Sequence, residues 1–138
     1  MIASEIARVS IKAHEGLRLL PYKDTVGKLT IGYGRNIEDR GISPDTADQM
    51  LDEDIELAER DCRDVYGEGF DDLTAERQAV LLEMCFQLGR PRFAGFVNML
   101  AASRRGEHQK VVSEMLASKW AQQVPKRAQE LADRYRLG

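Results

Sequence analysis

The longest regular pattern in this chain begins at Ser43-Pro44 and repeats apolar side chains at helical spacing to residue 65. Serine is a favoured helix cap and proline is favoured at the first helical position. The apolar positions are Ala47, Leu51, Ile55, Ala58, Cys62 and Val65. The other face is crowded with acids: Asp48, Asp52, Glu53, Glu56 and Glu59. A long helix with a single apolar stripe, over about 44–66, predicts a connection between a small lobe and a larger one.

Before this helix, the apolar spacing changes from that of a helix to that of short strands. Four apolar residues recur at steps of three and four, namely Ile2, Ile6, Val9 and Ala13. They predict a helix that ends at Gly16, a residue type that commonly terminates helices. From Leu17 to Arg35, short apolar runs are separated by Pro21 and several glycines. This pattern indicates strands and turns, and therefore a small β-hairpin region.

After the long helix, the chain becomes mainly helical. Thr74 is positioned to cap a helix, and residues 79–88 are apolar almost all round, which predicts a buried core helix. Gly89-Arg90-Pro91 ends it, and shorter helices are expected at about 93–104, 107–117 and 126–136. We therefore predict an α+β, mainly helical fold with two lobes.

The expected organisation is one domain over residues 1–138. A β-containing lobe covers about 14–50, the connecting helix covers about 44–66, and a helical lobe covers about 70–138 together with the N-terminal helix. The composition, 43% hydrophobic and 31% charged, is that of an ordinary soluble protein, and no apolar run is long enough to span a bilayer. Met1–Arg8 lacks the basic and apolar regions of a secretory signal, so we expect synthesis in a cytoplasm.

Charge is unevenly distributed along the chain. Residues 1–70 contain 9 Lys/Arg and 15 Asp/Glu, whereas residues 71–138 contain 11 and 8. A solvated acidic helix is one interpretation, and contact of the basic half with an anionic polymer is the other. The net charge of −3 and the absence of any Lys/Arg run longer than two argue against nucleic acid as a partner.

The cysteines and histidines do not form a metal-binding pattern. Cys62 and Cys85 fall at apolar helical positions outside any Cys-x-x-Cys unit, which predicts buried free thiols rather than a disulfide or a metal site. His14 and His108 lie far apart in the chain with no acidic or cysteine cluster at ligand spacing. Metal catalysis is therefore not supported.

One segment offers a candidate reaction centre. Glu15 is expected at the last turn of the first helix, and Asp24 and Thr30 follow on the glycine-rich hairpin. Two carboxyl groups in different electrostatic settings, facing one cleft, are what acid-catalysed cleavage of a glycosidic bond requires. The partial negative charge at a helix C-terminus favours the protonated form of Glu15, which is the form of a general acid.

Each of these residues also has an ordinary structural interpretation. Glu15 could lie at a solvent-facing helix end, and Asp24 lies in the turn pattern Tyr22-Lys23-Asp24-Thr25-x-Gly27, where aspartate usually bonds its own backbone. An isolated threonine such as Thr30 in a strand is mostly structural. The catalytic hypothesis therefore depends on the three occurring together.

In the working mechanism, Glu15 protonates the glycosidic oxygen while positive charge develops on the sugar ring. Asp24 either deprotonates a water on the opposite face, with Thr30 as its second partner, or attacks directly. The separation of the two carboxyl groups distinguishes these routes: about 5–5.5 Å for a nucleophile and about 6.5–9.5 Å for a water.

Several segments of the chain resemble the motifs of a known family. Glu15-Gly16-Leu17-Arg18, the Tyr22 to Gly27 turn and Thr30-Ile31-Gly32-Tyr33-Gly34 resemble the signature of phage-type lysozymes, the endolysins of tailed bacteriophages. The likeness continues through Phe86-Gln87-Leu88-Gly89 and Ala94-Gly95-Phe96-x-Asn98. It also includes Ser118-Lys119-Trp120-x-x-Gln123-x-Pro125-x-Arg127-Ala128, so it covers nearly the whole chain.

The resemblance implies a lysozyme-like fold and a muramidase that needs no cofactor. Its substrate would be the β-1,4 bond between N-acetylmuramic acid and N-acetylglucosamine in peptidoglycan, cleaved with inversion. Glu15 would be the acid, Asp24 and Thr30 would hold the water, and Arg127 would pair with Glu15. Gly34, Phe86 and Gln87 would line the saccharide cleft.

The expected setting is a monomer without stable membrane insertion, kept in the host cytoplasm until another protein opens the membrane. Alternatives are a virion-borne or toxin lysozyme domain, an enzyme for chitin, and a non-catalytic saccharide-binding protein of the same fold. Two departures from the family pattern stand out. Arg35 replaces a usual histidine, and we predict that it pairs with an acid on the long helix, with Asp54 the first choice by position. The chain stops at Gly138, earlier than longer relatives.

Overall fold

The structure is a computed structural model that describes all residues, 1–138. Its contacts divide into two compact units, Met1–Gln49 and Met50–Gly138, and each is described by itself. The chain is mainly helical with one small antiparallel sheet, which confirms the predicted α+β class. None of its helices is both long and apolar enough to cross a membrane.

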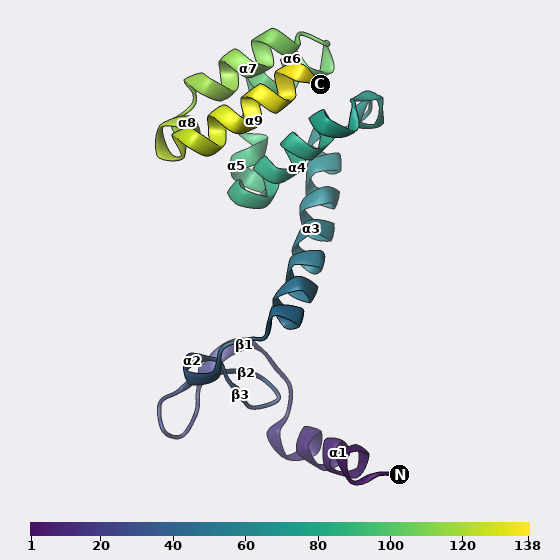
Figure 1. The fold of residues 1–138 in the computed structure, drawn as a ribbon, viewed down its shortest axis with the longest axis vertical. Helices are drawn as coiled ribbons and strands as arrows, with labels where there is room; N and C mark the ends of the chain where they lie inside the picture. Colours follow the sequence, from purple (N-terminus) through teal and green to yellow (C-terminus); the bar gives the residue numbers. More distant parts are fainter. The chain divides into compact units, whose positions relative to one another are not determined.

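The first unit consists of a helix, a three-stranded sheet and a short helix. Its elements are α1 (Ala3–Glu15), β1 (Arg18–Lys23), β2 (Leu29–Gly32), β3 (Arg35–Asn36) and α2 (Ile37–Arg40). The strands are antiparallel in the order β1-β2-β3, and α2 lies beside β2 and β3 (Figure 1). Thr30 is at the centre of the sheet, opposite Tyr22 on β1 and Asn36 on β3.

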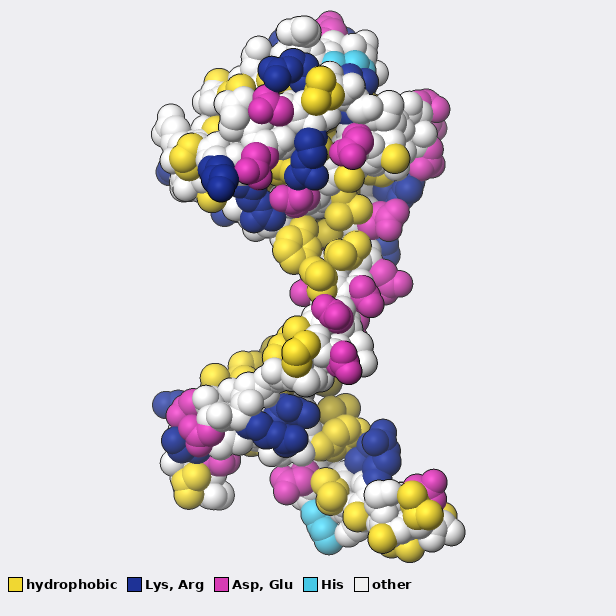
Figure 2. Space-filling view, viewed as in Figure 1, with side chains coloured by type: hydrophobic (Ala, Val, Ile, Leu, Met, Phe, Trp, Pro, Cys, Tyr) yellow, Lys and Arg dark blue, Asp and Glu magenta, His cyan; other side chains and the backbone are white.

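The predicted long helix is present as α3 (Pro44–Tyr66). The hydroxyl of Ser43 accepts the N–H of Thr46 at 3.1 Å, so the serine caps the helix as its sequence position predicts. The buried residues of α3 are Ala58, Cys62 and Tyr66, all in its C-terminal half. Asp and Glu side chains follow the exposed surface of α3 (Figure 2).

The second unit is entirely helical beyond α3. Its elements are the 3₁₀ helix η1 (Phe70–Asp72), α4 (Ala75–Leu88), α5 (Arg90–Ala94), α6 (Val97–Arg104), α7 (His108–Ala117), α8 (Lys119–Gln123) and α9 (Pro125–Leu137). Helix α7 packs against α6 and α9, and α9 also contacts α4 and α8 (Figure 1).

The core of the second unit is built around α4, as the apolar run at 79–88 predicted. Its buried side chains are Val80, Leu81, Met84, Cys85 and Leu88. Large side chains from the other helices close the core, among them Phe93, Met115 and Tyr135. Cys62 and Cys85 are buried and not disulfide-bonded, which confirms the prediction of buried thiols.

Four short helices were not predicted from the sequence: α2, η1, α5 and α8. Gly89 ends α4 as expected, but a new helix begins at Arg90 with Pro91 in its first turn. In the first turn of a helix the backbone N–H groups have no partner within the helix, so proline loses nothing there by lacking an N–H. Proline can therefore mark the start of a helix as well as the end of one. Ser118 accepts the N–H of Ala121 at 3.2 Å and thereby caps α8.

Candidate active site

Glu15 is the last residue of α1, the position predicted for it. The helix ends because Gly16 takes a φ of 71°, and its N–H donates to the carbonyl of Lys12 at 3.0 Å. The carboxyl group of Glu15 is exposed and lies against Gly34, in the turn between β2 and β3. A Cβ added at Gly34 would lie 2.5 Å from Glu15 Oε2. The structure therefore brings these two predicted site residues into contact.

Asp24 organises the turn between β1 and β2 with one of its two carboxylate oxygens. Its Oδ1 accepts the backbone N–H groups of Val26 and Lys28, both at 2.9 Å. The Asp24 N–H donates to the Lys28 carbonyl at 2.9 Å, and the Gly27 N–H donates to the Asp24 carbonyl at 3.0 Å. Asp24 therefore stabilises its turn, as the structural interpretation of the sequence expected. Its second carboxylate oxygen, Oδ2, has no hydrogen bond.

Thr30 is the one buried residue of the first unit, with 3% of its surface exposed. Its hydroxyl donates to the carbonyl of Lys28 at 2.9 Å. That donation uses the only hydroxyl proton, so Thr30 Oγ can bind a further group only as an acceptor. The peptide groups of Lys28 therefore connect Asp24 to Thr30, because Lys28 N–H bonds the former and its carbonyl accepts from the latter.

The remaining predicted residues belong to the second unit. Phe86 on α4 is 41% exposed. The amide oxygen of Gln87 accepts the indole N–H of Trp120 at 2.9 Å, which fixes the orientation of the amide and leaves its NH₂ group free to donate. Trp120 is in turn in edge-to-face contact with Phe96, at 6.3 Å between ring centroids.

Arg127 forms an ion pair with Glu83, 2.9 Å between Nε and Oε2, and Arg134 reaches the same carboxylate at 3.5 Å. The predicted pairing of Arg127 with Glu15 joins the two units and stays a prediction. Arg35 donates to the carbonyl of Gly41 at 3.4 Å. Its predicted pairing with Asp54 also joins the two units and likewise stays a prediction.

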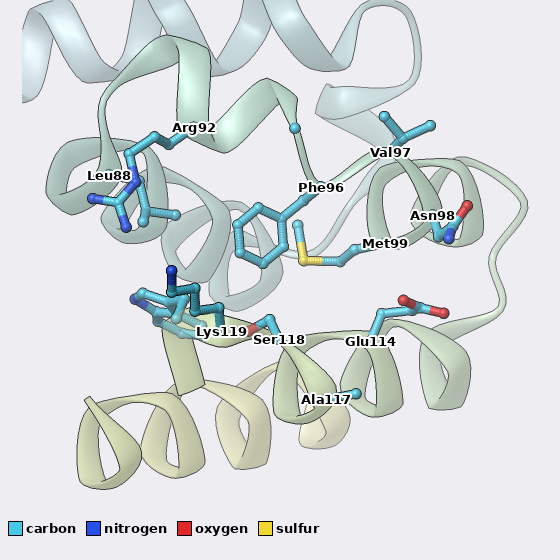
Figure 3. A pocket seen from close by; sticks show the side chains of 12 residues that line it. Leu88, Arg92, Phe96, Val97, Asn98, Met99, Glu114, Ala117, Ser118 and Lys119 are labelled. Atoms are coloured by element: carbon cyan, nitrogen blue, oxygen red, sulfur yellow. The ribbon is translucent and has the colours of Figure 1, made fainter. Parts of the chain in front are cut away.

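A groove of about 440 Å³ lies on the second unit, between the start of α6 and the α7–α8 corner. Phe96 and Met99 form its apolar centre, and Leu88 and Trp120 also line it. Figure 3 shows Arg92 and Lys119 towards one end and Glu114 towards the other. The groove thus combines an apolar floor with charges of both signs.

The basic side chains of the second unit do not form one continuous positive surface on the face seen in Figure 2, where Lys and Arg alternate with Asp and Glu. Several are paired, as in Arg136 with Asp133 at 2.9 Å and Arg90 with Asp64 at 3.1 Å. No three His, Cys, Asp or Glu side chains gather in a group that could hold a metal ion.

Sequence reasoning did not identify the contacts that Lys28 and Trp120 make with the predicted site residues. Lys28 acts through its backbone, which no residue-type pattern reveals. Helix α2 does have a recognisable signal, because asparagine is a favoured N-cap residue and Asn36 caps this helix. The Trp120–Gln87 bond joins residues 33 positions apart and has no local signature.

The first unit thus carries one carboxyl group at a helix end and a second in a turn, the pair of group types that glycoside hydrolysis uses. A family model described as phage lysozyme matches residues 12–136. The chain belongs to the phage lysozyme family. It is accordingly a cell-wall hydrolase of the muramidase type, with glycoside hydrolase activity and peptidoglycan as its substrate.

Proposed function

We propose that this protein cleaves the β-1,4 bond between N-acetylmuramic acid and N-acetylglucosamine, with Glu15 as general acid. The carboxyl group of Glu15 belongs to an exposed residue and lies beside a glycine whose missing side chain leaves room for that carboxyl group. A proton passes from Glu15 to the glycosidic oxygen as the bond to the anomeric carbon breaks. Gly34, Phe86 and Gln87 bind the saccharide, and the free NH₂ group of Gln87 donates to it.

The water that attacks the anomeric carbon is held by Asp24 and Thr30, and the reaction inverts the configuration. The observation that carries this step is that the backbone of Lys28 bonds both residues. Its N–H donates to Asp24 Oδ1, and its carbonyl accepts the Thr30 hydroxyl proton. Asp24 Oδ2 and the lone pairs of Thr30 Oγ remain as two acceptors for the two protons of one water. A carboxylate that acted as nucleophile would not need a hydroxyl partner, so this arrangement favours the water route.

The groove on the second unit extends the binding surface to the peptides that peptidoglycan carries. Such peptides contain carboxylates, amines and apolar side chains, and the groove offers Arg92 and Lys119, Glu114, and an apolar floor. Neutralising both cations, by Arg92→Met and Lys119→Met, should raise KM on intact peptidoglycan several-fold. The same variant should cleave a peptide-free glycan strand normally.

Product analysis on purified peptidoglycan tests the proposed bond and the proposed stereochemistry together. New reducing ends should be muramic acid, and proton NMR in the first minutes should show the α anomer, the inverted product. New N-acetylglucosamine ends would overturn the proposed bond, and the β anomer as first product would overturn the water route. Glu15→Gln should remove activity while the melting temperature changes little; unchanged activity would overturn its role as the acid.

We further propose that the protein acts as a monomer in the lysis of a bacterial host and stays in the cytoplasm until the membrane is permeabilised. Its membership of a phage family supports this role. Cells that express the chain should lyse only after a membrane-permeabilising agent is added. Lysis without the agent would favour an export route, and association with purified virions would favour a virion-borne enzyme.

A further inference from the structure

The backbone of Lys28 and Leu29 connects the proposed water-holding pair to a second set of contacts on α2. On one side, Lys28 bonds Asp24 and Thr30. On the other side, the N–H of Leu29 donates to Glu38 Oε1 at 3.2 Å. The ammonium group of Lys28 lies 3.5 Å from Glu38 Oε2 and 3.3 Å from Asp39 Oδ1. Glu38 thus contacts the Leu29 N–H and the Lys28 ammonium group, and Lys28 is the residue whose backbone bonds Asp24 and Thr30.

The bond from Leu29 to Glu38 completes a hydrogen-bond ladder that β3 is too short to complete. Strand β3 has two residues, which pair with Thr30 and Ile31 of β2. Leu29 is one residue beyond this pairing, and alternate residues of an antiparallel strand direct their N–H groups to the same edge. The Lys28 carbonyl accepts the Asp24 N–H on the β1 side, so the N–H of the next residue, Leu29, faces the opposite edge and would lack a strand partner there. The carboxylate of Glu38 takes the place of the missing strand residue.

Helix α2 is itself held firmly to the sheet, so Glu38 has a defined position. Asn36 belongs to β3 and also caps α2, since its Oδ1 accepts the N–H of Asp39 at 3.0 Å. Its amide NH₂ donates to Asp39 Oδ2 at 3.2 Å. The residue that pairs with Thr30 across the sheet therefore also sets the start of the helix that carries Glu38.

We propose that Glu38 is a positioning residue for the water-holding pair, acting through Leu29 and Lys28 on Asp24 and Thr30. The inference rests on the proposed function of that pair. The hydrogen bond to Leu29 carries the effect, because Lys28, Glu38 and Asp39 are well exposed and ion pairs between exposed side chains contribute little. Loss of Glu38 frees the strand end at Leu29, and the Lys28 peptide that orients Asp24 and Thr30 shifts with it.

The test compares two substitutions at Glu38 with a control that changes charge equally. Glu38→Ala should lower kcat about five-fold with KM within about two-fold, because a small displacement of a reacting group slows chemistry more than binding. Glu38→Gln keeps an oxygen acceptor for Leu29 and should retain most of kcat. Glu53→Ala removes an exposed acid on α3 that makes no ion pair or hydrogen bond, and it should leave both constants unchanged.

A double substitution separates positioning from a general loss of structure. In an Asp24→Asn background the water-holding pair is already impaired, so adding Glu38→Ala should reduce the residual kcat by much less than five-fold. Full additivity, a rise in KM with kcat unchanged, or equal losses in Glu38→Ala and Glu53→Ala would each overturn the inference. If Glu38→Ala does not fold, the Glu38→Gln variant provides the test. A folded Glu38→Gln protein that loses kcat five-fold would contradict the role given to the Leu29–Glu38 hydrogen bond.

The proposed function and this inference fail in different ways. If the unmodified protein released no new reducing ends from peptidoglycan, the proposed function itself would fall. If it did so, and Glu38→Ala retained full kcat, only the positioning role would fall.

Discussion

The carboxyl group of Glu15 lies against Gly34, so that a Cβ atom at position 34 would come within 2.5 Å of Oε2 and 2.8 Å of Cδ. The φ of Gly34 is +72°, a conformation that side-chain-bearing residues rarely adopt. Two independent requirements, a left-handed backbone and space for the acid, therefore meet at one glycine. Gly34 was predicted only as a cleft-lining residue, and the structure adds that its missing side chain leaves space for the Glu15 carboxyl group.

Gly34→Ala should lower kcat at least about ten-fold, because the added methyl group displaces the acid from its place. The strained φ should also reduce the free energy of unfolding by about 1–2 kcal/mol. Gly41→Ala is the matched control, since Gly41 has a φ of +64° but no atom within 4 Å of the added Cβ. It should lose stability without losing kcat. Equal activity losses in the two variants would contradict the steric explanation.

Thr30→Val should separate the hydroxyl of Thr30 from its packing. Valine fills the same volume but cannot hold a water, so kcat should fall at least about ten-fold. The Lys28 carbonyl keeps its bond from the Asp24 N–H, so the free energy of unfolding should fall by only about 1 kcal/mol. Thr30→Ser should restore most of kcat. Steady-state kinetics and urea unfolding measure the two effects, and a fully active Thr30→Val enzyme would remove Thr30 from the mechanism.

A buried chain of hydroxyl groups in the second unit ends at a histidine. Tyr66 and Ser103 are 2.9 Å apart, Ser103 and Tyr135 are 2.7 Å apart, and His108 Nδ1 lies 3.2 Å from the Tyr135 hydroxyl. When His108 Nδ1 carries no proton, it accepts the Tyr135 hydroxyl proton. Tyr135 then accepts from Ser103, and Ser103 accepts from Tyr66, so each hydroxyl proton has an acceptor. Protonation of His108 turns its Nδ1 into a donor and leaves one buried hydroxyl proton without an acceptor.

The pKa of His108 is lowered, first by burial and then by the charge of Arg77 from α4. The acid next to His108 in the chain, Glu107, forms an ion pair with Arg105, with 3.1 Å between Nη2 and Oε2. Because the unfolded chain holds a proton on His108 at a higher pH than the folded one, folding stability should be complete above about pH 6.5 and fall as the pH decreases below it. Urea unfolding at several pH values should show this loss, and His108→Gln should reduce it. An identical pH dependence in both proteins would contradict the role of His108.

The two thiols should be unreactive in the folded protein. Burial raises the pKa of Cys62 to about 12 and also raises that of Cys85, and both side chains are almost fully buried. The thiolate is the reactive form, so a disulfide reagent at pH 8 should label neither cysteine until the chain unfolds. The rate of labelling should then follow the rate of unfolding across a urea series. Rapid labelling of native protein would contradict the burial of Cys62 and Cys85 in the core.

Much of the fold could be predicted because it is local in origin. The spacing of Ala47 to Val65 predicted α3, and the serine at position 43 predicted its start. The pattern Asp24-Thr25-x-Gly27 predicted a turn in which an aspartate bonds its own backbone, and it does so. The short helices were missed because five residues or fewer contain too little periodicity, and caps such as Asn36 and Ser118 set their starts instead.

The candidate site was predictable in its residues but not in its connections. Glu15 at a helix end and Thr30 in a strand follow from spacing and glycine placement. That Glu38 would complete the ladder at Leu29 depends on β3 being only two residues long. That Gln87 would be oriented by Trp120 depends on how α4 and α8 pack.

By itself, the sequence determined where helices, strands and turns form, because periodicity, capping and glycine conformation act between residues a few positions apart. Only the tertiary structure decided which acid completes the ladder at Leu29, why Gly34 must lack a side chain, and which hydroxyls meet at Tyr135. These are contacts between groups brought together by packing. Their geometry follows from the shape of the whole unit, and no spacing along the chain encodes it.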